Sequence, residues 1–426
     1  MLLTVLPHFL VLGQAGYSPY SSKGIGEIQG LGLTQNNGMG GVGISNGNGM
    51  FYNNANPALL YKNNLSVFSI GMAGEYKNVS TSDLSQKNYT GGFDHLMLGL
   101  PLMIDRWTIG FGLMPYSTVN YKYNTQGKVV GDPNADVIKN FEGSGGFNKV
   151  FLSNGLRLYK NLSLGVTVGY LFGSIKEEIS TQVRTQKQVN DTTTASFLSN
   201  TVLTTNRLTA GDIYLLGGLA YRLPLSNNRG VNVGVTYEVG GDKDAKLFQN
   251  IRNRNYRDNV NFANDTLHET RGTMKLPSTL GIGLSYEKSY HWTVGADLML
   301  RNWSEYRSFS ENGQGSNEGF HNSYTVAVGA EYIPDVASID SYLKRAVYRI
   351  GFSHERLPYK INDKSIDDFG INFGVSLPVR NYSSFNLAFK LGRRGTTEHN
   401  LIKENYFRVN LGVTFNDRWF VRRRFD

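Results

Sequence analysis

Two overlapping glycine-rich motifs near the N-terminus are the first candidates for chemistry. Residues 38–43 fit the G-x-G-x-x-G pattern of dinucleotide-binding loops, and residues 43–47 fit the G-x-S-x-G pattern of a hydrolase nucleophile elbow. The first pattern binds a pyrophosphate where it follows a strand and opens a helix, and the second needs a strand-to-helix turn with a distant acid and histidine. The surrounding sequence predicts neither context. We therefore interpret these glycines as positions of close backbone packing.

The other residue types that catalyse reactions or bind metals are scattered. Seven histidines occur, but no pair has the spacing of zinc ligands, and the sequence contains no cysteine. Asp242 with Asp244, and Asp363 with Asp367 and Asp368, could bind Ca²⁺ or bridge lipopolysaccharide in a loop, although solvated loop carboxylates are the simpler interpretation. The 43 Lys and Arg residues, against 34 Asp and Glu, form small clusters rather than a basic stripe. We therefore expect no enzyme, no cofactor, no metal site and no nucleic-acid partner.

An apolar run opens the sequence and ends at the small-x-small triplet Gly13-Gln14-Ala15. The run, residues 2–12, is too short to cross a bilayer, and its form is typical of a secretory signal cleaved after Ala15. Pro7, in its middle, disfavours the alternative of a buried core helix. We expect residues 1–15 to be a signal peptide and the mature protein to reside in the cell envelope.

Beyond residue 65, hydrophobic residues alternate with small or polar ones at every second position. In residues 162–170, leucine, valine and tyrosine alternate with serine, glycine and threonine, and residues 407–415 repeat the scheme. This period indicates strands with one apolar face, here long enough for the ~25 Å band of a lipid-facing barrel wall. About 14 such segments occur, near 65–79, 90–102, 106–121, 145–159, 161–178, 209–223, 230–243, 271–287, 290–306, 320–333, 346–357, 366–378, 384–393 and 404–416.

The connectors between these segments alternate in length, which favours a barrel over a soluble sandwich. Long polar connectors at 124–143, 180–208 and 244–270 alternate with tight turns such as 159–161. Membrane barrels combine long outer loops with short periplasmic turns in this way. Residues 335–345 depart from the rule, because they should be periplasmic yet are long; their positions 339–343 could form a short helix. The aromatic residues expected in the interfacial girdle are Trp107, Tyr170, Tyr237, Tyr286, Tyr306 and Tyr332.

We therefore assign residues 65–426 to an all-β fold, a transmembrane antiparallel β-barrel of about 14 strands that spans the outer membrane of a Gram-negative-type cell many times. Residues 16–64 lack the strand pattern and are too short for a stable domain of their own. We therefore expect them to lie inside the barrel, as an N-terminal plug or hatch in the lumen.

The run Gly38-Met39-Gly40-Gly41, followed by Asn56-Pro57-Ala58, resembles the hatch of FadL-like outer-membrane proteins, which are channels for long-chain fatty acids and other hydrophobic compounds. The resemblance continues in the wall, at residues 110–115, 276–283, 296–297 with 303–304, and 329–332. It implies a 14-stranded barrel, a hatch that blocks the lumen, and lateral exit of the ligand through a gap in a kinked strand.

Three groups of candidate site residues follow from this resemblance and from the lumen-facing positions. The hatch and gate group is Gly38, Gly40, Gly41, Asn56, Pro57 and Ala58. Pro115 cannot donate to a strand ladder and adjoins the strand that the family kinks, so the group expected at the lateral opening is Gly110, Gly112 and Pro115. The group expected to bind ligand in the lumen is Met114, Phe151, Arg157, Asp297, Met299, Arg301 and Lys390.

Among these, Arg157, Arg301 and Lys390 are expected to anchor a ligand carboxylate. Asp297 and Arg301 lie ~13 Å apart on one strand, so they cannot pair with each other. Each needs a partner on a neighbouring strand or on the hatch, because a lone charge in a low-dielectric lumen is costly.

The expected function is that of an outer-membrane channel for passive uptake of hydrophobic, fatty-acid-like small molecules. The hatch is expected to gate the channel, and the ligand is expected to leave it laterally. The alternative is a non-transporting barrel that acts as an accessory subunit or docking partner of an outer-membrane secretion or assembly complex. The expected partners are outer-membrane lipid and lipopolysaccharide, the hydrophobic ligand, and possible protein partners in an envelope complex. Apolar lumen positions are few, so an acyl-binding tunnel is not evident from the wall.

Overall fold

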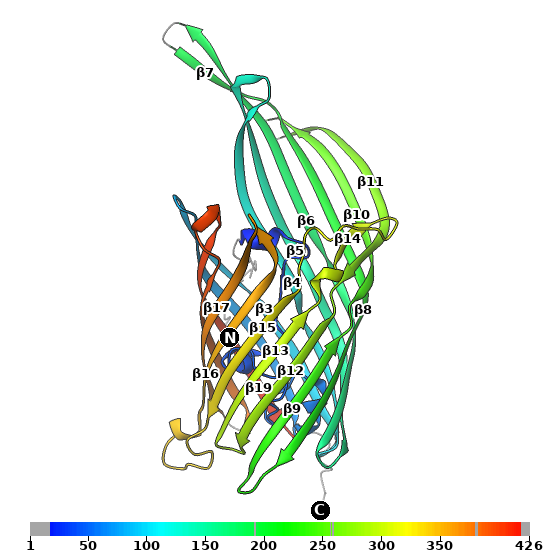
Figure 1. Ribbon diagram of the computed structural model, residues 1–426, viewed down its shortest axis with the longest axis vertical. Coiled ribbons are helices and arrows are strands. Elements are labelled where there is room, and N and C mark those ends of the chain that lie inside the picture. The colour runs from blue at the N-terminus through cyan, green and yellow to red at the C-terminus, as the bar shows by residue number, and fades with distance from the viewer. Residues whose placement is uncertain (1–17, 191–192, 256, 258–259, 380–381, 419–426) are drawn as a thin grey trace, which may run out of the picture.

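The computed structural model describes residues 18–418, apart from 191–192, 256, 258–259 and 380–381. The predicted signal peptide, residues 1–15, therefore lies outside the described residues. The chain forms one closed antiparallel sheet that surrounds its own N-terminal segment (Figure 1). No helix within the described ranges is long and apolar enough to cross a membrane.

The predicted 14-stranded antiparallel barrel is confirmed. The wall closes where β19 pairs with β2, from Lys403↔Ser80 to Asp417↔Ser66. Three wall strands are interrupted and carry two labels each (β9 with β10, β11 with β12, β13 with β14), and β7 belongs to an outer tip. The strands are β1 (Glu27–Ile28), β2 (Ser66–Ser80), β3 (Ser85–Met103), β4 (Trp107–Val129), β5 (Asp132–Tyr159), β6 (Leu162–Asn190), β7 (Thr193–Leu198), β8 (Thr201–Pro224), β9 (Arg229–Glu238), β10 (Gly241–Arg254), β11 (Asn261–Leu276), β12 (Thr279–Lys288), β13 (Trp292–Arg301), β14 (Arg307–Ser310), β15 (Ser323–Tyr332), β16 (Val347–Ile361), β17 (Lys364–Pro378), β18 (Ser384–Arg394) and β19 (Lys403–Asp417).

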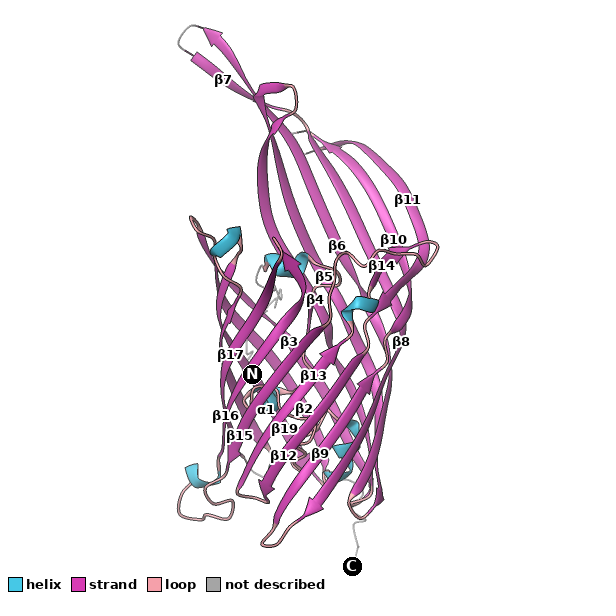
Figure 2. Cartoon of the chain, viewed as in Figure 1, coloured by secondary structure: helices cyan, strands magenta, loops and turns pink. Residues whose placement is uncertain are grey.

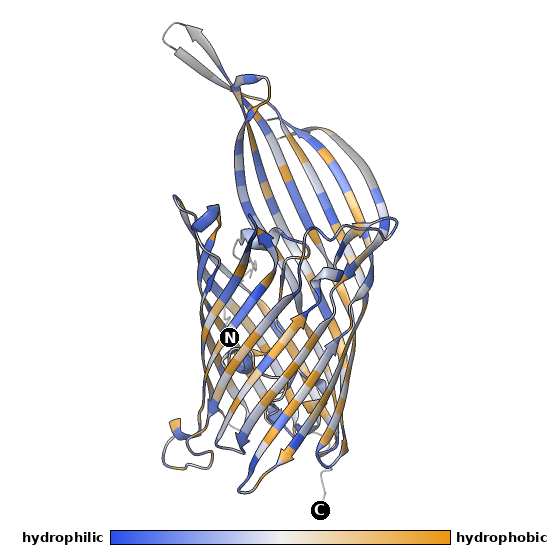
Figure 3. Ribbon diagram, in the orientation of Figure 1, coloured by the Kyte–Doolittle hydropathy of each residue, from blue (hydrophilic) through white to orange (hydrophobic). Residues whose placement is uncertain are grey.

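Side chains alternate across this wall as the sequence period requires. On β6, Leu164, Val166 and Val168 are exposed on the outer surface, whereas Ser163 and Thr167 are buried on the lumen side. The orange and blue positions that alternate along the wall strands in Figure 3 show the same pattern. Because the wall strands are mostly paired on both sides along their apolar stretches, most backbone polar groups are satisfied where lipid surrounds the barrel.

One member of the predicted aromatic girdle is placed differently. Trp107, Tyr170, Tyr237, Tyr286 and Tyr332 are exposed on the outer wall, as expected. Tyr306 is instead buried at the upper end of the lumen, where its ring lies 4.8 Å from that of Phe320. The chain leaves the strand geometry at η3 (Trp303–Glu305), and this break turns Tyr306 inward.

The prediction that residues 124–143, 180–208 and 244–270 are long loops is wrong. Strands β4, β5, β6, β8, β10 and β11 continue through most of these stretches and rise beyond the rest of the rim as one curved sheet (Figure 1). We call this part the tall sheet. The register between β6 and β8 continues unbroken from Leu162↔Tyr221 to Thr181↔Val202. Cross-strand pairing therefore keeps these residues in strands even where hydrophobic and polar residues alternate weakly.

Residues 18–64, here called the hatch, lie inside the barrel. Their short helical elements contact β4, β5, β6, β8 and the strands from β17 to β19 (Figure 2). The 3-10 and α-helical elements of the chain are η1 (Pro19–Ser22), α1 (Thr34–Asn37), η2 (Pro57–Lys62), η3 (Trp303–Glu305), η4 (Leu343–Arg345) and η6 (Glu398–Asn400). The long turn before β16 contains the short 3-10 helix η4 at Leu343–Arg345. The helix expected at residues 339–343 therefore lies a few residues later in the chain.

Candidate functional site

The wall has a lateral gap between β3 and β4. Their pairing runs only from Met103↔Trp107 to Leu96↔Leu113. Beyond this point, residues 85–95 of β3 pair with β2 alone, whereas β4 turns to β5 and accepts the short hatch strand β1 at Ser117 and Thr118. Pro115, which has no N–H to donate, and a bulge between Pro115 and Ser117 mark the point of separation.

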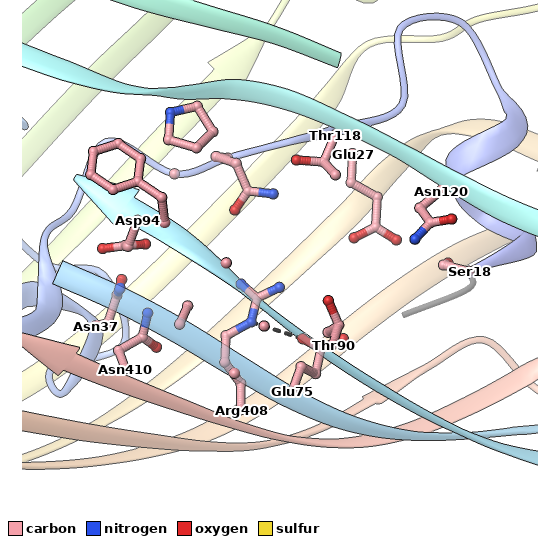
Figure 4. Close-up of a pocket in the computed structure, with 18 of the residues that line it drawn as sticks. Ser18, Glu27, Asn37, Glu75, Thr90, Asp94, Thr118, Asn120, Arg408 and Asn410 are labelled. Atoms are coloured by element: carbon pink, nitrogen blue, oxygen red, sulfur yellow. Dashed lines mark hydrogen bonds and ion pairs between the residues drawn. The ribbon is translucent and has the colours of Figure 1, made fainter. Parts of the chain in front are cut away.

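A cavity of about 260 Å³ lies behind this gap. Its lining comes from β3 (Thr90 to Asp94), from β4 (Met114, Pro115, Thr118), from the hatch and from the inner faces of β2 and β19 (Figure 4). Phe93 is exposed on the outer surface at this level, beside Met72 of β2, so the gap opens within the lipid-facing band. The lining is mixed, with many hydrogen-bonding side chains such as Asn37, Asn120 and Asn410.

A second cavity, of about 180 Å³, lies deeper between the hatch and the strands from β13 to β19. The two cavities share Glu27, Gln29, Gly30, Gly32, Asn37, Arg408 and Asn410 in their linings, so they adjoin across the hatch. Four of the predicted ligand residues line the deeper cavity: Asp297, Met299, Arg301 and Lys390.

The predicted ligand residues are not all brought together. Met114 lines the cavity at the gap, and Phe151 packs beside it in an apolar cluster with Met97. Arg157 lies at the opposite, periplasmic end of the lumen, with its guanidinium 5.6 Å from the ring centre of Tyr61. The sequence pattern identified a lumen-facing arginine there but could not give its depth.

Two of the three cations that were expected to anchor a ligand carboxylate, Arg301 and Lys390, already have carboxylate partners. Arg301 Nη1 lies 3.3 Å from Glu355 Oε1, and Lys390 Nζ lies 3.3 Å from Asp368 Oδ1. Asp297 is bound to the hatch instead, since its Oδ2 accepts hydrogen bonds from the backbone N–H groups of Gly43 (2.7 Å) and Ile44 (2.8 Å). Charges in a low-dielectric lumen require such partners.

A network of eight ionic side chains joins the hatch to the wall, and sequence reasoning missed it. Arg394 of β18 binds Glu27 of the hatch, Asp368 and Glu404, while Lys77 of β2 binds Glu27, Glu75 and Glu404. Arg408 pairs with Glu75, and Lys390 with Asp368, so four acids face four bases. The members lie far apart in the sequence, and only the barrel closure brings them together.

This network also sets the charge state of hatch groups. Burial alone would raise the pKa of the Glu27 carboxyl, but the charges of Arg394, Lys77 and Arg408 hold that pKa well below its usual range. Burial, together with the negative charge of Glu404, raises the pKa of Tyr20 to about 12. The Tyr20 hydroxyl donates a hydrogen bond to the carbonyl of Ile402.

The Asn56-Pro57-Ala58 turn packs against closed wall, away from the gap. Asn56 Nδ2 donates to the carbonyl oxygens of Ile44 (2.8 Å) and Leu219 (3.2 Å), and its Oδ1 accepts from the N–H of Ala58 (3.0 Å). Wall glycines make room for the turn, because a Cβ at Gly165 would lie 2.2 Å from the backbone of Ala58, and one at Gly218 2.2 Å from Asn56 Oδ1. The turn therefore anchors the hatch on β6 and β8.

The glycines of the first hatch motif make equally close contacts on the other side of the lumen. A Cβ at Gly38 would approach Gly374 of β17 to 2.9 Å, and one at Gly40 would approach the carbonyl of Phe352 to 2.6 Å. Gly41 adopts φ 102° and has no atom near its Cβ position. Gly110 and Gly112 lie below the gap, in the paired part of β4, where they make room for Tyr52 and Phe151.

An apolar cluster fills the upper lumen. Trp303 and Phe320 stack with ring centres 5.0 Å apart, and Tyr359 and the hatch residue Tyr20 join them. The same cluster continues to Tyr116 and Phe147 on the opposite wall.

With this geometry established, comparison with known proteins gives the family. A family model described as BamG matches residues 1–426, the whole chain. The chain belongs to the BamG family. No curated protein matches its sequence.

Solved structures show which fold this BamG-family protein has. A FadL homologue of Pseudomonas aeruginosa aligns with a TM-score of 0.59 at 12% identity, over 92% of this chain and 100% of that one. The Pseudomonas putida toluene transporter TodX aligns at 0.56 with 16% identity, over 93% and 100%. The Ralstonia pickettii toluene transporter TbuX aligns at 0.56 with 15% identity, over 92% and 99%. The FadL-like fold inferred from the hatch and wall motifs is confirmed, and the protein is a multi-pass outer-membrane β-barrel.

Proposed function

We propose that this protein is a passive outer-membrane channel that moves a hydrophobic molecule with a small polar head between the outer side and the membrane, through the gap between β3 and β4. The observation that carries the proposal is the end of the β3–β4 pairing at Leu96↔Leu113, with a cavity directly behind it. Transfer of an apolar tail into lipid is favourable without any energy source or covalent chemistry. FadL-like solved structures with the same fold include transporters of toluene, which supports this class of cargo.

The lining of the cavities indicates the kind of head group. Arg301, Lys390 and Arg408 are each neutralised by a carboxylate of the wall, so a fatty-acid-like ligand would meet hydrogen-bonding groups rather than a free cation. Asn37, Asn410 and Thr118 supply such groups beside Phe93, Met114 and Pro115. This mixture of few polar groups and apolar contacts is typical of small-molecule sites.

In this proposal the hatch is the gate. It separates the deeper cavity from the gap, and Glu27, Gln29 and Gly30 line both cavities. A small movement of residues 27–32 would join the two cavities into one path, whereas the Asn56-Pro57-Ala58 anchor could stay in place on β6 and β8.

A second candidate function is that of a docking subunit in an outer-membrane secretion or assembly complex. The tall sheet favours it, because its edge along residues 120–129 of β4 pairs only with β5 and touches the hatch near Asn120. Exposed strand edges of this kind can pair with other chains. The apolar cluster that fills the upper lumen also suits a barrel that transports nothing.

One purification distinguishes the two functions. The protein is extracted in a gentle non-ionic detergent, and one half is extracted with organic solvent for mass spectrometry while the other half is analysed for co-purifying polypeptides. The channel proposal predicts a hydrophobic compound at roughly one per chain that is lost when Gly92→Trp fills the cavity. Stoichiometric partner proteins without such a compound would favour the docking function.

A further inference from the structure

A third cavity lies on the other side of the hatch, at the rim that carries the short turns. Its volume is about 830 Å³, within the range of ligand sites in proteins. Its roof is formed by hatch residues 46–51, Tyr61, Lys62 and Asn64, and its walls by Leu65 and the ends of strands on the periplasmic side, including the turn at 287–293. We call this cavity the vestibule.

Two cations of the vestibule differ from those of the lumen because they have no carboxylate partner. Lys62 Nζ donates to the carbonyl of Gly47 at 3.1 Å, and Arg157 stacks on the ring of Tyr61, the neighbour of Lys62. No ion pair is formed by either side chain within the described ranges of the chain. The acids of the same lining have other partners: Arg222 lies 2.9 Å from Glu287, and Arg349 lies 2.8 Å from Glu331. The third acid, Asp105, accepts a hydrogen bond from the Asn64 amide at 3.0 Å. Both cations therefore line the vestibule without a carboxylate partner.

The vestibule also has apolar lining residues. Met50, Phe51, Leu65, Trp292, Ile333 and Val336 line the same cavity. An arginine and a lysine together suit a carboxylate or phosphate, since the guanidinium can bind two oxygens and the ammonium acts as a compact charge. An apolar lining next to such an anion site is complementary to a molecule with an anionic head and an apolar tail.

We propose that the vestibule is a binding site for an amphipathic anion. Lys62 and Arg157 hold its carboxylate or phosphate head under the hatch, and the tail lies along the wall that contains Trp292, Ile333 and Val336. The site is separate from the gap between β3 and β4, so it stands whether or not the barrel transports a ligand. It also assigns Arg157, expected from the sequence to anchor a carboxylate in the lumen, to an anion site on the periplasmic side.

Photolabelling of the full-length protein in lipid nanodiscs tests this site. The probes are dodecanoic acid with a diazirine in its tail, its methyl ester as the uncharged match, and the corresponding dodecyl phosphate. Labelled residues are mapped by peptide mass spectrometry. The test variant is Lys62→Gln with Arg157→Gln, the charge-preserving variant is Lys62→Arg with Arg157→Lys, and the control is Lys160→Gln, an exposed cation of the same rim outside the vestibule.

The expected result is labelling of residues 46–51 and 290–293 by one or both anions, and about tenfold less by the ester, because the ester cannot form the charge-assisted contacts. The double glutamine variant should lose about the same factor, whereas the charge-preserving variant and Lys160→Gln should keep the labelling. The anion that labels the vestibule more strongly identifies the preferred head group.

Equal labelling by acid and ester, or full labelling of the double glutamine variant, would overturn the proposal. Crosslinks from the vestibule to a foreign polypeptide, with no labelling by either anion, would assign the cavity to a protein segment and overturn it as well. Heat-dependent migration in detergent gels checks that each variant forms a closed barrel, so a loss of labelling cannot be attributed to misfolding.

Discussion

Glu27 of the hatch and Arg394 of β18 form an ion pair through Glu27 Oε1 and Arg394 Nη1, although 367 positions separate them in the sequence. Lys77 also lies 3.9 Å from the Glu27 carboxylate. Glu27 is the hatch's ionic contribution to the otherwise wall-borne network around Arg394. The pair therefore couples the position of the hatch to the closed wall.

Replacing this carboxylate should loosen the first part of the hatch. Glu27→Gln leaves Arg394 and Lys77 with one acid fewer, which we expect to weaken the docking of residues 18–32 by about 2 kcal/mol. Because the sequence has no cysteine, Gly30→Cys introduces a unique thiol, and a nitroxide attached there reports the motion of this part of the hatch. Gly30 is exposed and no atom lies near its Cβ position.

The nitroxide spectrum should sharpen in Glu27→Gln and remain broad in the control Glu398→Gln, an exposed acid beside β18. An unchanged spectrum in Glu27→Gln would show that the ionic network does not hold the hatch.

The same label should reveal a pH dependence of defined sign. The pKa of Glu27 is lowered in the folded protein, so its stabilising charge is present above the ordinary carboxyl pKa, near 4.3, and is lost as the pH falls through the lower folded value. The spectrum at Gly30→Cys should therefore stay constant from about pH 7 to pH 5 and sharpen only in stronger acid. Sharpening between pH 7 and pH 5 would mean that another group controls the hatch.

Two adjacent glycines of β8 test the anchor of the Asn56-Pro57-Ala58 turn. A Cβ at Gly218 would lie 2.2 Å from Asn56 Oδ1, whereas the nearest atom to a Cβ at Gly217 is 4.0 Å away. Gly218→Ala should lower the free energy of unfolding by about 1–3 kcal/mol through this overlap, and Gly217→Ala should change it little. Urea unfolding in lipid vesicles measures both. Equal effects of the two substitutions would exclude a close-packed anchor at this position.

The sequence was sufficient for the barrel because its signal is local. The alternation in residues 162–170 and its repeats place the lipid-facing side chains directly, and the short turns fix the order of neighbouring strands. The tall sheet was missed for the converse reason. Residues 124–143 are mostly polar, and their apolar residues do not alternate, since Val129 and Val130 are adjacent, as are Val137 and Ile138. No period therefore distinguishes a solvated strand from a loop, and cross-strand pairing keeps these residues extended.

The candidate site was predictable only in part. Pro115 marks the gap because a missing N–H is a property of the residue itself. The partners of Arg301 and Lys390 were not predictable, since Glu355 and Asp368 lie on other strands and their facing depends on barrel register. The sequence identified Arg157 as a lumen-facing cation but could not place it in the vestibule, because depth along the lumen is not encoded in an alternating pattern.

Uptake through the gap is tested most directly with two matched glycine variants. No atom lies within 4 Å of a Cβ at either Gly92, which lines the cavity at the gap, or Gly127, which lies near the outer end of β4. The initial rate of uptake of a radiolabelled hydrophobic compound such as toluene is measured in proteoliposomes. Gly92→Trp should slow uptake by about tenfold, since the indole occupies the cavity, while Gly127→Trp leaves the rate unchanged. Uptake by Gly92→Trp at the rate of the unmodified protein would contradict lateral transfer between β3 and β4.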